Sequence, residues 1–192
     1  MDRLPERVTT PRLVLRRWRH DEAGVLHSIV TANLEHLRPW MPWIMHEPLT
    51  IPERVRLIED WTQGWEQGGD AYLGVFLDGE AIGSAGYHNR VGPDAVEIGY
   101  WIDQRHVRQG YATELTAALT TAAFELDHLD RVQVHTDEAN EPSGGVPARL
   151  GFRLDRIETR EPQAPGESGR LMIWTTTRNT WRPPANELPP PG

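Results

Sequence analysis

Alternating apolar and polar residues occupy several short segments of the chain, and this period of two is typical of β-strands that bury one face. Other segments place apolar residues three and four positions apart, which is typical of amphipathic helices. The alternation predicts strands at residues 13–18, 72–77, 80–87, 95–102, 131–135, 152–157 and 171–176. The helical spacing predicts helices at residues 21–34, 52–65, 108–126 and 140–150.

The turns between the strands predict how the strands pair. The Asp-Gly dipeptide at residues 78–79 joins two alternating runs, and both residues tolerate the positive φ of a tight hairpin. A second turn at residues 92–94 extends the hairpin into an antiparallel meander. The order strand, helix, strand over residues 95–135 adds one parallel pair. The expected fold class is therefore α+β, with a mixed, mostly antiparallel sheet of about six to seven strands flanked by helices.

Length and charge set broad limits on the class of protein. The chain has 192 residues, which corresponds to a single domain, expected at residues 1–181. Residues 182–192 are rich in proline, which lacks a backbone donor, and are expected to form a disordered tail. Lys and Arg number 20 against 28 Asp and Glu, a net charge of −8. This charge disfavours nucleic acid as a partner and favours cationic partners or substrates.

Several kinds of chemistry are excluded or disfavoured by composition. The chain has no Cys, which excludes disulfides and thiolate chemistry. It has no apolar run near the ~20 residues of a membrane span and no signal-like segment at its start, so we expect no membrane partner and a cytoplasmic location. No HExxH pair occurs, so no metal is expected. The isolated histidines are interpreted as packing or surface residues: His88, His106, His128 and His135.

The segment that opens the third predicted helix has the composition of an anion-binding loop. It consists of Val107, Arg108, Gln109, Gly110, Tyr111, Ala112 and Thr113. Small residues there allow close approach, and consecutive backbone N–H groups at the positive end of a helix dipole suit a pyrophosphate. The alternative is a tight strand-to-helix turn that needs small residues for packing alone.

Three segments around this loop together resemble a known family. They are residues 97–102 (Glu-Ile-Gly-Tyr-Trp-Ile), residues 110–114 (Gly-Tyr-Ala-Thr-Glu) and residues 140–152, where Asn140 and Ser143 precede Arg-Leu-Gly-Phe. In this order and context they resemble the GNAT superfamily of acyl-coenzyme A-dependent N-acyltransferases, specifically the RimJ/RimL branch of ribosomal-protein N-terminal acetyltransferases. Further similar segments at residues 10–16 and 33–43 extend the resemblance over about residues 8–181.

The resemblance implies an acyl-CoA co-substrate, with acetyl-CoA the first expectation, bound where two parallel strands splay apart. The main chain of Tyr100, Trp101 and Ile102 would pair with the pantetheine arm. The loop of residues 107–113 would hold the pyrophosphate. Val107 departs from the family pattern, which usually has Gln or Arg at that position. Because the loop binds mainly through main-chain N–H groups, this departure is expected to matter little.

The resemblance also implies direct attack of an amine on the thioester in a ternary complex, so some group must take a proton from the amine. Glu97 is the first candidate, directly or through water; the alternative is a carboxylate that faces solvent or pairs with an Arg. Glu161 is the second candidate. Ser143 would donate a hydrogen bond to the leaving thiolate, and Asn140 would bind the pantetheine or nearby main chain. Helix capping is the alternative for both Asn140 and Ser143.

The acceptor is specified least. Trp40, Met41 and Trp43 belong to a region that walls the acceptor pocket in the family, so they are candidates for substrate contact, with a core or lid role as the alternative. An acidic protein suits a cationic amine such as a peptide N-terminus, a lysine, a polyamine or an aminoglycoside. A small-molecule acceptor, a succinyl-CoA donor and a non-catalytic CoA-binding module stay as alternatives, and homodimerisation is left open.

Overall fold

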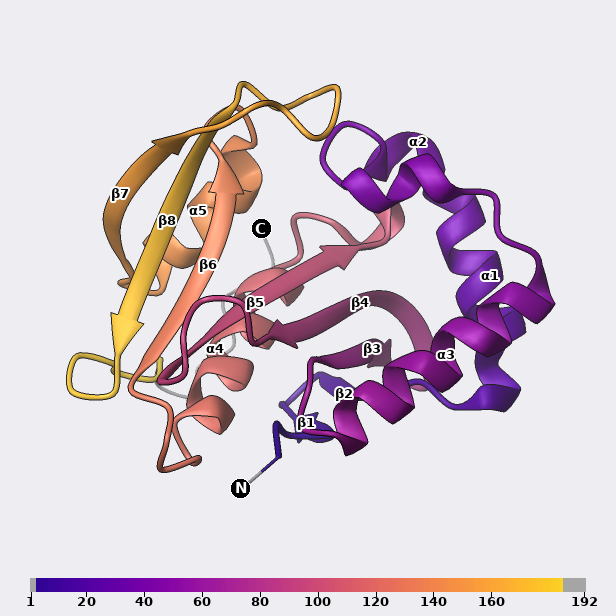
Figure 1. The fold of residues 1–192 in the computed structure, drawn as a ribbon, viewed down its shortest axis with the longest axis horizontal. Coiled ribbons are helices and arrows are strands. Elements are labelled where there is room, and N and C mark those ends of the chain that lie inside the picture. The colour runs from indigo at the N-terminus through magenta and orange to yellow at the C-terminus, as the bar shows by residue number, and fades with distance from the viewer. Residues whose placement is uncertain (1–2, 185–192) are drawn as a thin grey trace.

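Eight strands form one sheet in the computed structural model, which describes residues 3–184 (Figure 1). The strands are β1 (Arg7–Thr9), β2 (Leu13–Arg17), β3 (Ala71–Leu77), β4 (Glu80–His88), β5 (Ala95–Ile102), β6 (Arg131–Asp137), β7 (Arg153–Thr159) and β8 (Arg170–Thr177). Their order across the sheet is β1-β2-β3-β4-β5-β6-β8-β7. The sequence predicted about six to seven strands. The three residues of β1 are too few to show an alternating pattern.

Helices cover both faces of the sheet. The α-helices are α1 (Ala23–Ala32), α2 (Leu34–Leu37), α3 (Ile51–Glu66), α4 (Tyr111–Ala123) and α5 (Glu141–Arg149), and the 3₁₀ helices are η1 (His20–Glu22), η2 (Pro42–His46) and η3 (Gln104–His106). Within residues 3–184, no helix is both long and apolar enough to cross a membrane. Most of the Pro-rich tail, from residue 185 on, lies outside the described residues.

The hairpin between β3 and β4 confirms the turn prediction. Asp78 and Gly79 have φ values of 49° and 86°, as expected for a two-residue turn with positive φ at both positions. The register pairs Leu77 with Glu80 on either side of the turn. The predicted meander then continues through the antiparallel pairing of β4 and β5.

The predicted parallel pair is short, and the two strands then diverge. β5 and β6 pair only at Ala95 with Arg131, Val96 with Val132 and Glu97 with Gln133. Beyond Glu97, β5 continues to Ile102 beside β4, while β6 continues to Asp137 beside β8. Figure 1 shows β5 and β6 running apart from this contact. The mixed sheet with splayed parallel strands is therefore confirmed.

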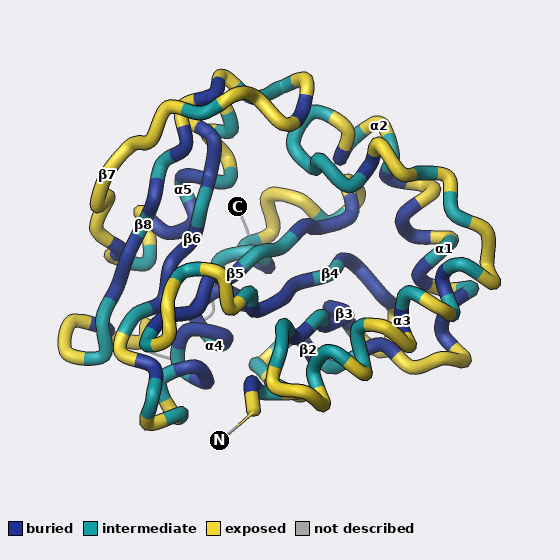
Figure 2. Tube along the Cα trace, in the orientation of Figure 1, coloured by how far each residue is buried: buried dark blue, intermediate teal, exposed yellow. Residues whose placement is uncertain are grey.

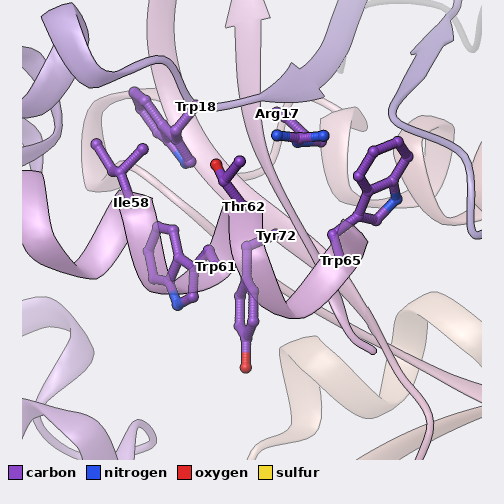
Figure 3. A pocket seen from close by; sticks show the side chains of 7 residues that line it. All are labelled: Arg17, Trp18, Ile58, Trp61, Thr62, Trp65 and Tyr72. Carbon is purple, nitrogen blue, oxygen red and sulfur yellow. The ribbon is translucent and has the colours of Figure 1, made fainter. Parts of the chain in front are cut away.

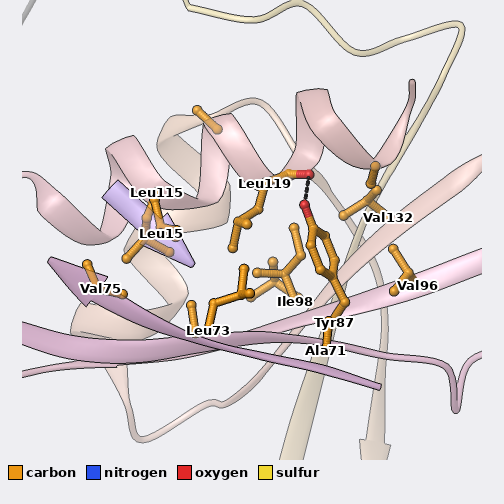
Figure 4. Packing of buried hydrophobic residues seen from close by; sticks show 14 of the residues in the cluster. Leu15, Ala71, Leu73, Val75, Tyr87, Val96, Ile98, Leu115, Leu119 and Val132 are labelled. Carbon is orange, nitrogen blue, oxygen red and sulfur yellow. Dashed lines mark hydrogen bonds between the residues drawn. The ribbon is translucent and has the colours of Figure 1, made fainter. Parts of the chain in front are cut away.

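The main core lies between the sheet and α4. Leu115 and Leu119 of α4 are fully buried against Leu73 and Ile98, and each such leucine stabilises the fold by about 1.5–3 kcal/mol. Tyr87 points from β4 toward α4, where its hydroxyl donates to the Leu119 carbonyl at 2.7 Å (Figure 4). A second cluster packs α1 and α3 on the opposite face. Figure 2 shows the buried centre of the sheet and the exposed edge strand β7.

Candidate active site

The predicted anion-binding loop forms one turn between η3 and α4. Gly110 is the N-cap of α4 with φ of 80°, and Arg108 also has positive φ, at 60°. Gln109 between them does not have positive φ, and such alternation of left-handed and other conformations directs successive amides toward a common point. The first intrahelical bond of α4 runs from the Glu114 N–H to the Gly110 carbonyl at 3.0 Å. The N–H groups of Tyr111, Ala112 and Thr113 precede that bond, so the helix start presents donors suited to an anion.

A latch that the sequence analysis missed fixes this loop to the N-terminal strands. The Glu114 carboxylate accepts the Thr10 hydroxyl at 2.5 Å, the Arg12 main-chain N–H at 3.0 Å and the Arg12 Nε at 2.6 Å. Arg12 also donates to the Gln109 carbonyl at 3.0 Å and lies over the Tyr111 ring. The sequence carries a signal for this latch, because residues 10–16 and 110–114 both belong to segments that resemble the family.

The edge of β5 that faces the gap carries the residues expected to bind a pantetheine. Tyr100, Trp101 and Ile102 pair with β4 on one side, at Ala85, Ser84 and Gly83. Pairing with β6 ends at Glu97, so these three residues lie beyond the parallel contact. A side chain at Gly83 would place its Cβ 2.2 Å from the Trp101 carbonyl oxygen, so this stretch of β4 and β5 requires glycine.

Asn140 and Ser143 lie across the gap from β5, at the start of α5. Asn140 is the N-cap, and its Oδ1 accepts the Ser143 N–H at 3.3 Å. Helix capping, the alternative role for this pair, is therefore present. Tyr100 spans the gap, because its hydroxyl donates to the Ser143 carbonyl at 3.4 Å. Burial raises the pKa of Tyr100 to about 12, so the phenol stays protonated at neutral pH.

Glu97 is buried at the point where the parallel strands separate, and it is paired with an Arg. Its carboxylate accepts the Arg90 Nε at 2.7 Å and the Arg90 Nη2 at 2.6 Å, and it lies 3.3 Å from the His135 Nδ1. Burial opposes ionisation, but the hydrogen bonds from Arg90 and the nearby charge of His135 outweigh it and lower the pKa of Glu97 overall. A carboxylate held ionised in this way is a weak proton acceptor.

His88 packs against its neighbours, as expected, and it also pairs with Asp70. It stands opposite Glu97 in the register of β4 and β5. Its Nδ1 lies 2.8 Å from the Asp70 Oδ2, and the Asn89 N–H donates to the Asp70 Oδ1 at 2.9 Å. The Tyr72 ring meets the imidazole edge to face at 5.4 Å between ring centroids. Sheet pairing thus gathers titratable groups that are distant in the sequence.

An aromatic cleft adjoins this cluster (Figure 3). The Trp61 and Tyr72 rings stack at 4.7 Å between centroids, and the Arg17 guanidinium lies 4.2 Å from the Trp65 ring. The cleft lies between α3 and the first strands and is lined by Arg17, Trp18, Ile58, Trp61, Thr62, Trp65 and Tyr72. It continues the His88 cluster along one face of the sheet.

The expected acceptor region lies around α2 and η2. Met41 and Trp43 are partly buried against the second core cluster, and the Trp43 ring lies 6.4 Å from that of Trp101. Trp40 is half-buried. The Gly166 N–H donates to the Pro39 carbonyl at 2.9 Å, so the segment between β7 and β8 contacts this region. Glu161, on the same segment, is exposed, and the structure brings it into no described contact with Ser143.

Comparisons with known proteins agree with this geometry. Residues 12–153 match the acetyltransferase (GNAT) domain family. The ribosomal protein uS5-alanine N-acetyltransferase of Escherichia coli (strain K12) is 30% identical over 185 residues, which are 92% of this chain and 93% of that protein. YdaF of Bacillus subtilis (strain 168) is 30% identical over 163 residues, which are 83% of this chain and 88% of YdaF.

A solved structure shows the same fold at lower identity. RimL, a ribosomal L7/L12 alpha-N-protein acetyltransferase in complex with coenzyme A, superposes with a TM-score of 0.80 at 20% identity. The superposition covers 92% of this chain and 98% of that chain. The matches in sequence extend over most of the chain and include the loop before α4. The chain therefore belongs to the GNAT family of N-acetyltransferases.

Proposed function

We propose that this N-acetyltransferase takes its acetyl group from acetyl-CoA and transfers it to the free amine at the N-terminus of a peptide or protein. The observation that carries the proposal is the gap between β5 and β6, which opens beside the N-terminal end of α4. One place in the fold therefore offers both an unpaired strand edge and an array of N–H donors. A pantetheine amide needs the first, and a pyrophosphate needs the second.

The donor would be held mainly by main chain. The N–H groups of residues 108–113 would bind the pyrophosphate, with Val107 placing its exposed side chain outside. The main chain of residues 100–102 would pair with the pantetheine arm, and Asn140 would contact it from the start of α5. The RimL structure named above is a complex with coenzyme A, which supports this choice of donor.

The reaction is a direct attack of a neutral amine on the thioester carbonyl within a ternary complex. Acetyl-CoA supplies the activated acyl group, and a main-chain N–H would stabilise the oxyanion. Ser143 would donate a hydrogen bond to the departing thiolate. Glu97, held ionised by Arg90, would act as a fixed negative charge that favours a cationic amine, with proton transfer passing through water if it takes part. Glu161 is kept as the second carboxylate to test.

A protein or peptide acceptor is supported by the relatives and by charge. The Escherichia coli relative is named for the alanine of ribosomal protein uS5. The net charge of −8 favours a cationic amine, and Trp40, Met41 and Trp43 would contact the residues that follow it. We propose the cytoplasm as the place of reaction, because the Escherichia coli relative is named for a ribosomal protein.

Calorimetric titration with acetyl-CoA and succinyl-CoA tests the donor, and a thiol-release assay tests the acceptor. The acceptor panel contains basic N-terminal peptides, the same peptides with blocked N-termini, polyamines and aminoglycosides. We expect acetyl-CoA to bind and only the free-amine peptides to release thiol. If only a polyamine or an aminoglycoside is acetylated, the acceptor is a small molecule and not a peptide. If neither acetyl-CoA nor succinyl-CoA binds, the proposal is refuted.

Three substitutions then test the proposed catalytic groups: Glu97→Gln, Ser143→Ala and Glu161→Gln. We expect the first two to lower kcat with little change in the Kd of acetyl-CoA. If only Glu161→Gln lowers kcat, the role proposed for the Glu97 carboxylate belongs to Glu161 instead. Full activity in all three would show that none of these side chains takes part in the reaction.

A further inference from the structure

Asp70 and His88 form a rigid pair that the reaction outlined above does not use. The Asp70 carboxylate is fixed at both oxygens, by the His88 Nδ1 at 2.8 Å and by the Asn89 N–H at 2.9 Å. Burial opposes its ionisation, but these hydrogen bonds lower the pKa of Asp70 overall, so it is a carboxylate at neutral pH. A carboxylate beside Nδ1 selects the tautomer in which Nδ1 carries the proton and Nε2 carries a lone pair.

The position of Nε2 is set by two glycines. A Cβ built on Gly99 would lie 3.1 Å from the His88 Nε2, and one built on Gly86 would lie 3.5 Å from it. The imidazole therefore lies across β5 at the residue immediately before Tyr100. Only 15% of the His88 side chain is exposed, whereas Asp70 reaches solvent further, at 33%. Nε2 thus lies on the face of the sheet that α3 covers, close to where the parallel strands separate.

The other titratable groups at this point are already engaged. Glu97 is forked by Arg90. His135 lies 3.3 Å from Glu97 through Nδ1 and 2.8 Å from the Gln133 Oε1 through Nε2. Within residues 3–184, His88 makes its side-chain hydrogen bond through Nδ1 alone. Among these groups, His88 is the one with a basic nitrogen directed away from its partner.

We propose that His88, oriented by Asp70, takes the proton of the acceptor amine; the proposal rests on the N-acetyltransferase reaction proposed above. The acceptor ammonium gives one proton to the His88 Nε2, and the freed nitrogen lone pair attacks the thioester carbonyl. The C–N bond forms, the nitrogen's second proton passes to solvent water, and the C–S bond breaks with its electron pair on sulfur. The imidazolium returns its proton to solvent or to the thiolate, so that the products are the amide, CoA thiol and one proton. Asp70 is a positioning residue.

The charges that face His88 determine the expected pH dependence. Asp70 from the turn before β3 and Glu97 from β5 favour the imidazolium, whereas Arg90 after β4 and a protonated His135 on β6 oppose it. Tyr72 on β3 adds a neutral phenol near Asp70. The reaction needs neutral His88, so we expect kcat/KM to fall in acid.

The first test is His88→Gln, with His20→Gln at an exposed position as the matched control. We expect kcat with a peptide acceptor to fall by about 10²–10⁴-fold in the His88 variant. The acidic limb of its pH profile should disappear, while the Kd of acetyl-CoA and Tm stay close to those of His20→Gln. If the wild type acetylates the peptide and His88→Gln does so at the same rate, with the same acidic limb in its pH profile, the role of His88 is overturned. The proposed function then stays intact. A wild type without acetyl-CoA binding would refute the proposed function itself.

The second test is Asp70→Asn, which decides the matter if His88→Gln disturbs folding or donor binding. An Asn amide can donate to Nδ1 and so select the tautomer with a protonated Nε2, which lowers the maximal rate by about 10²-fold or more. The substitution should also move the acidic limb of kcat/KM, which a purely structural role of Asp70 would leave in place. A limb that stays in place, with an unchanged rate, would overturn the proposal.

Discussion

The two sides of the gap between β5 and β6 are built by different means. The proposed donor side consists of contiguous chain, residues 107–113, and would act through main-chain N–H groups held by an αL glycine. The acceptor side consists of side chains that are distant in the sequence and that sheet pairing brings into contact, namely Asp70, His88, Glu97 and His135. The donor side should therefore be sensitive to backbone conformation and tolerant of side-chain exchange. The acceptor side should show the reverse.

Apart from the His88 and Asp70 variants, the largest effect is expected for Glu97→Gln on the acceptor side. The neutral amide cannot compensate the positive charge of Arg90, so the side chains around position 97 are displaced. We expect kcat/KM to fall by about 10²-fold, whereas the Kd of acetyl-CoA changes by less than about twofold. Glu138→Gln, which removes the carboxylate of an exposed pair with Arg170, is the control and should keep full activity. A tenfold weaker Kd in Glu97→Gln would contradict the separation of the two sides.

Acidification should remove the stability of the acceptor side in two steps. Burial lowers the pKa of His135, so the unfolded chain binds its proton first, and stability declines as pH falls below the ordinary value of about 6.5. The lowered pKa of Glu97 contributes stability above about pH 4.3 that is lost as pH falls through its folded value. Urea unfolding from pH 8 to pH 3.5 measures both, and the lower step should be smaller in Glu97→Gln. An identical profile in that variant would show that the Glu97 pair adds no stability.

The next largest effect is expected for Glu114→Ala on the donor side. The substitution leaves Arg12 and the Thr10 hydroxyl without their acceptor, which costs about 2–3 kcal/mol of unfolding free energy. Release of the Gln109 carbonyl contact should weaken acetyl-CoA binding about tenfold. Glu59→Ala on the exposed face of α3 is the control. Calorimetry and urea unfolding give both quantities, and an unchanged Kd would show that the latch does not shape the loop.

A smaller effect is expected for Gly110→Ala. An L-residue at φ of 80° is strained, so the unfolding free energy should fall by about 1–2 kcal/mol and the binding free energy of acetyl-CoA by no more than this. Gly64→Ala is a control of opposite sign, because this helical glycine has open space around its Cβ and should stabilise the fold by about 0.5–1 kcal/mol. A Gly110→Ala variant as stable as wild type would show that the αL conformation is not needed.

The smallest effect is expected for Val107→Gln, which restores the residue usual in the family. Val107 is 39% exposed, and the loop is expected to bind through its main chain, so the Kd of acetyl-CoA should change by less than about twofold. Titration calorimetry on both proteins measures the difference. A gain of tenfold would mean that the side chain at this position contacts the donor, contrary to the comparison of the two sides.

The contrast between the two sides also explains what could be predicted from the sequence. The loop of residues 107–113 was predictable because its donors and its glycine are neighbours in the chain. The Asp70 and His88 pair was not, because it depends on the register of β3, β4 and β5 rather than on a local pattern. The fold was largely predictable from alternation and from the Asp78 and Gly79 turn. The latch between Arg12 and Glu114 was missed because residues so far apart meet only after β2 has joined the sheet.

The short parallel contact has a mechanical consequence. Three residue pairs link the portion of the sheet from β1 to β5 with the portion from β6 to β8, whereas neighbouring antiparallel ladders are longer. The Tyr100 hydroxyl and the Gly166 contact with Pro39 are further ties between the portions. Local opening can therefore begin at this junction at a lower free energy than global unfolding. The parallel contact is thus the narrowest junction in the sheet, and the proposed reaction site lies beside it.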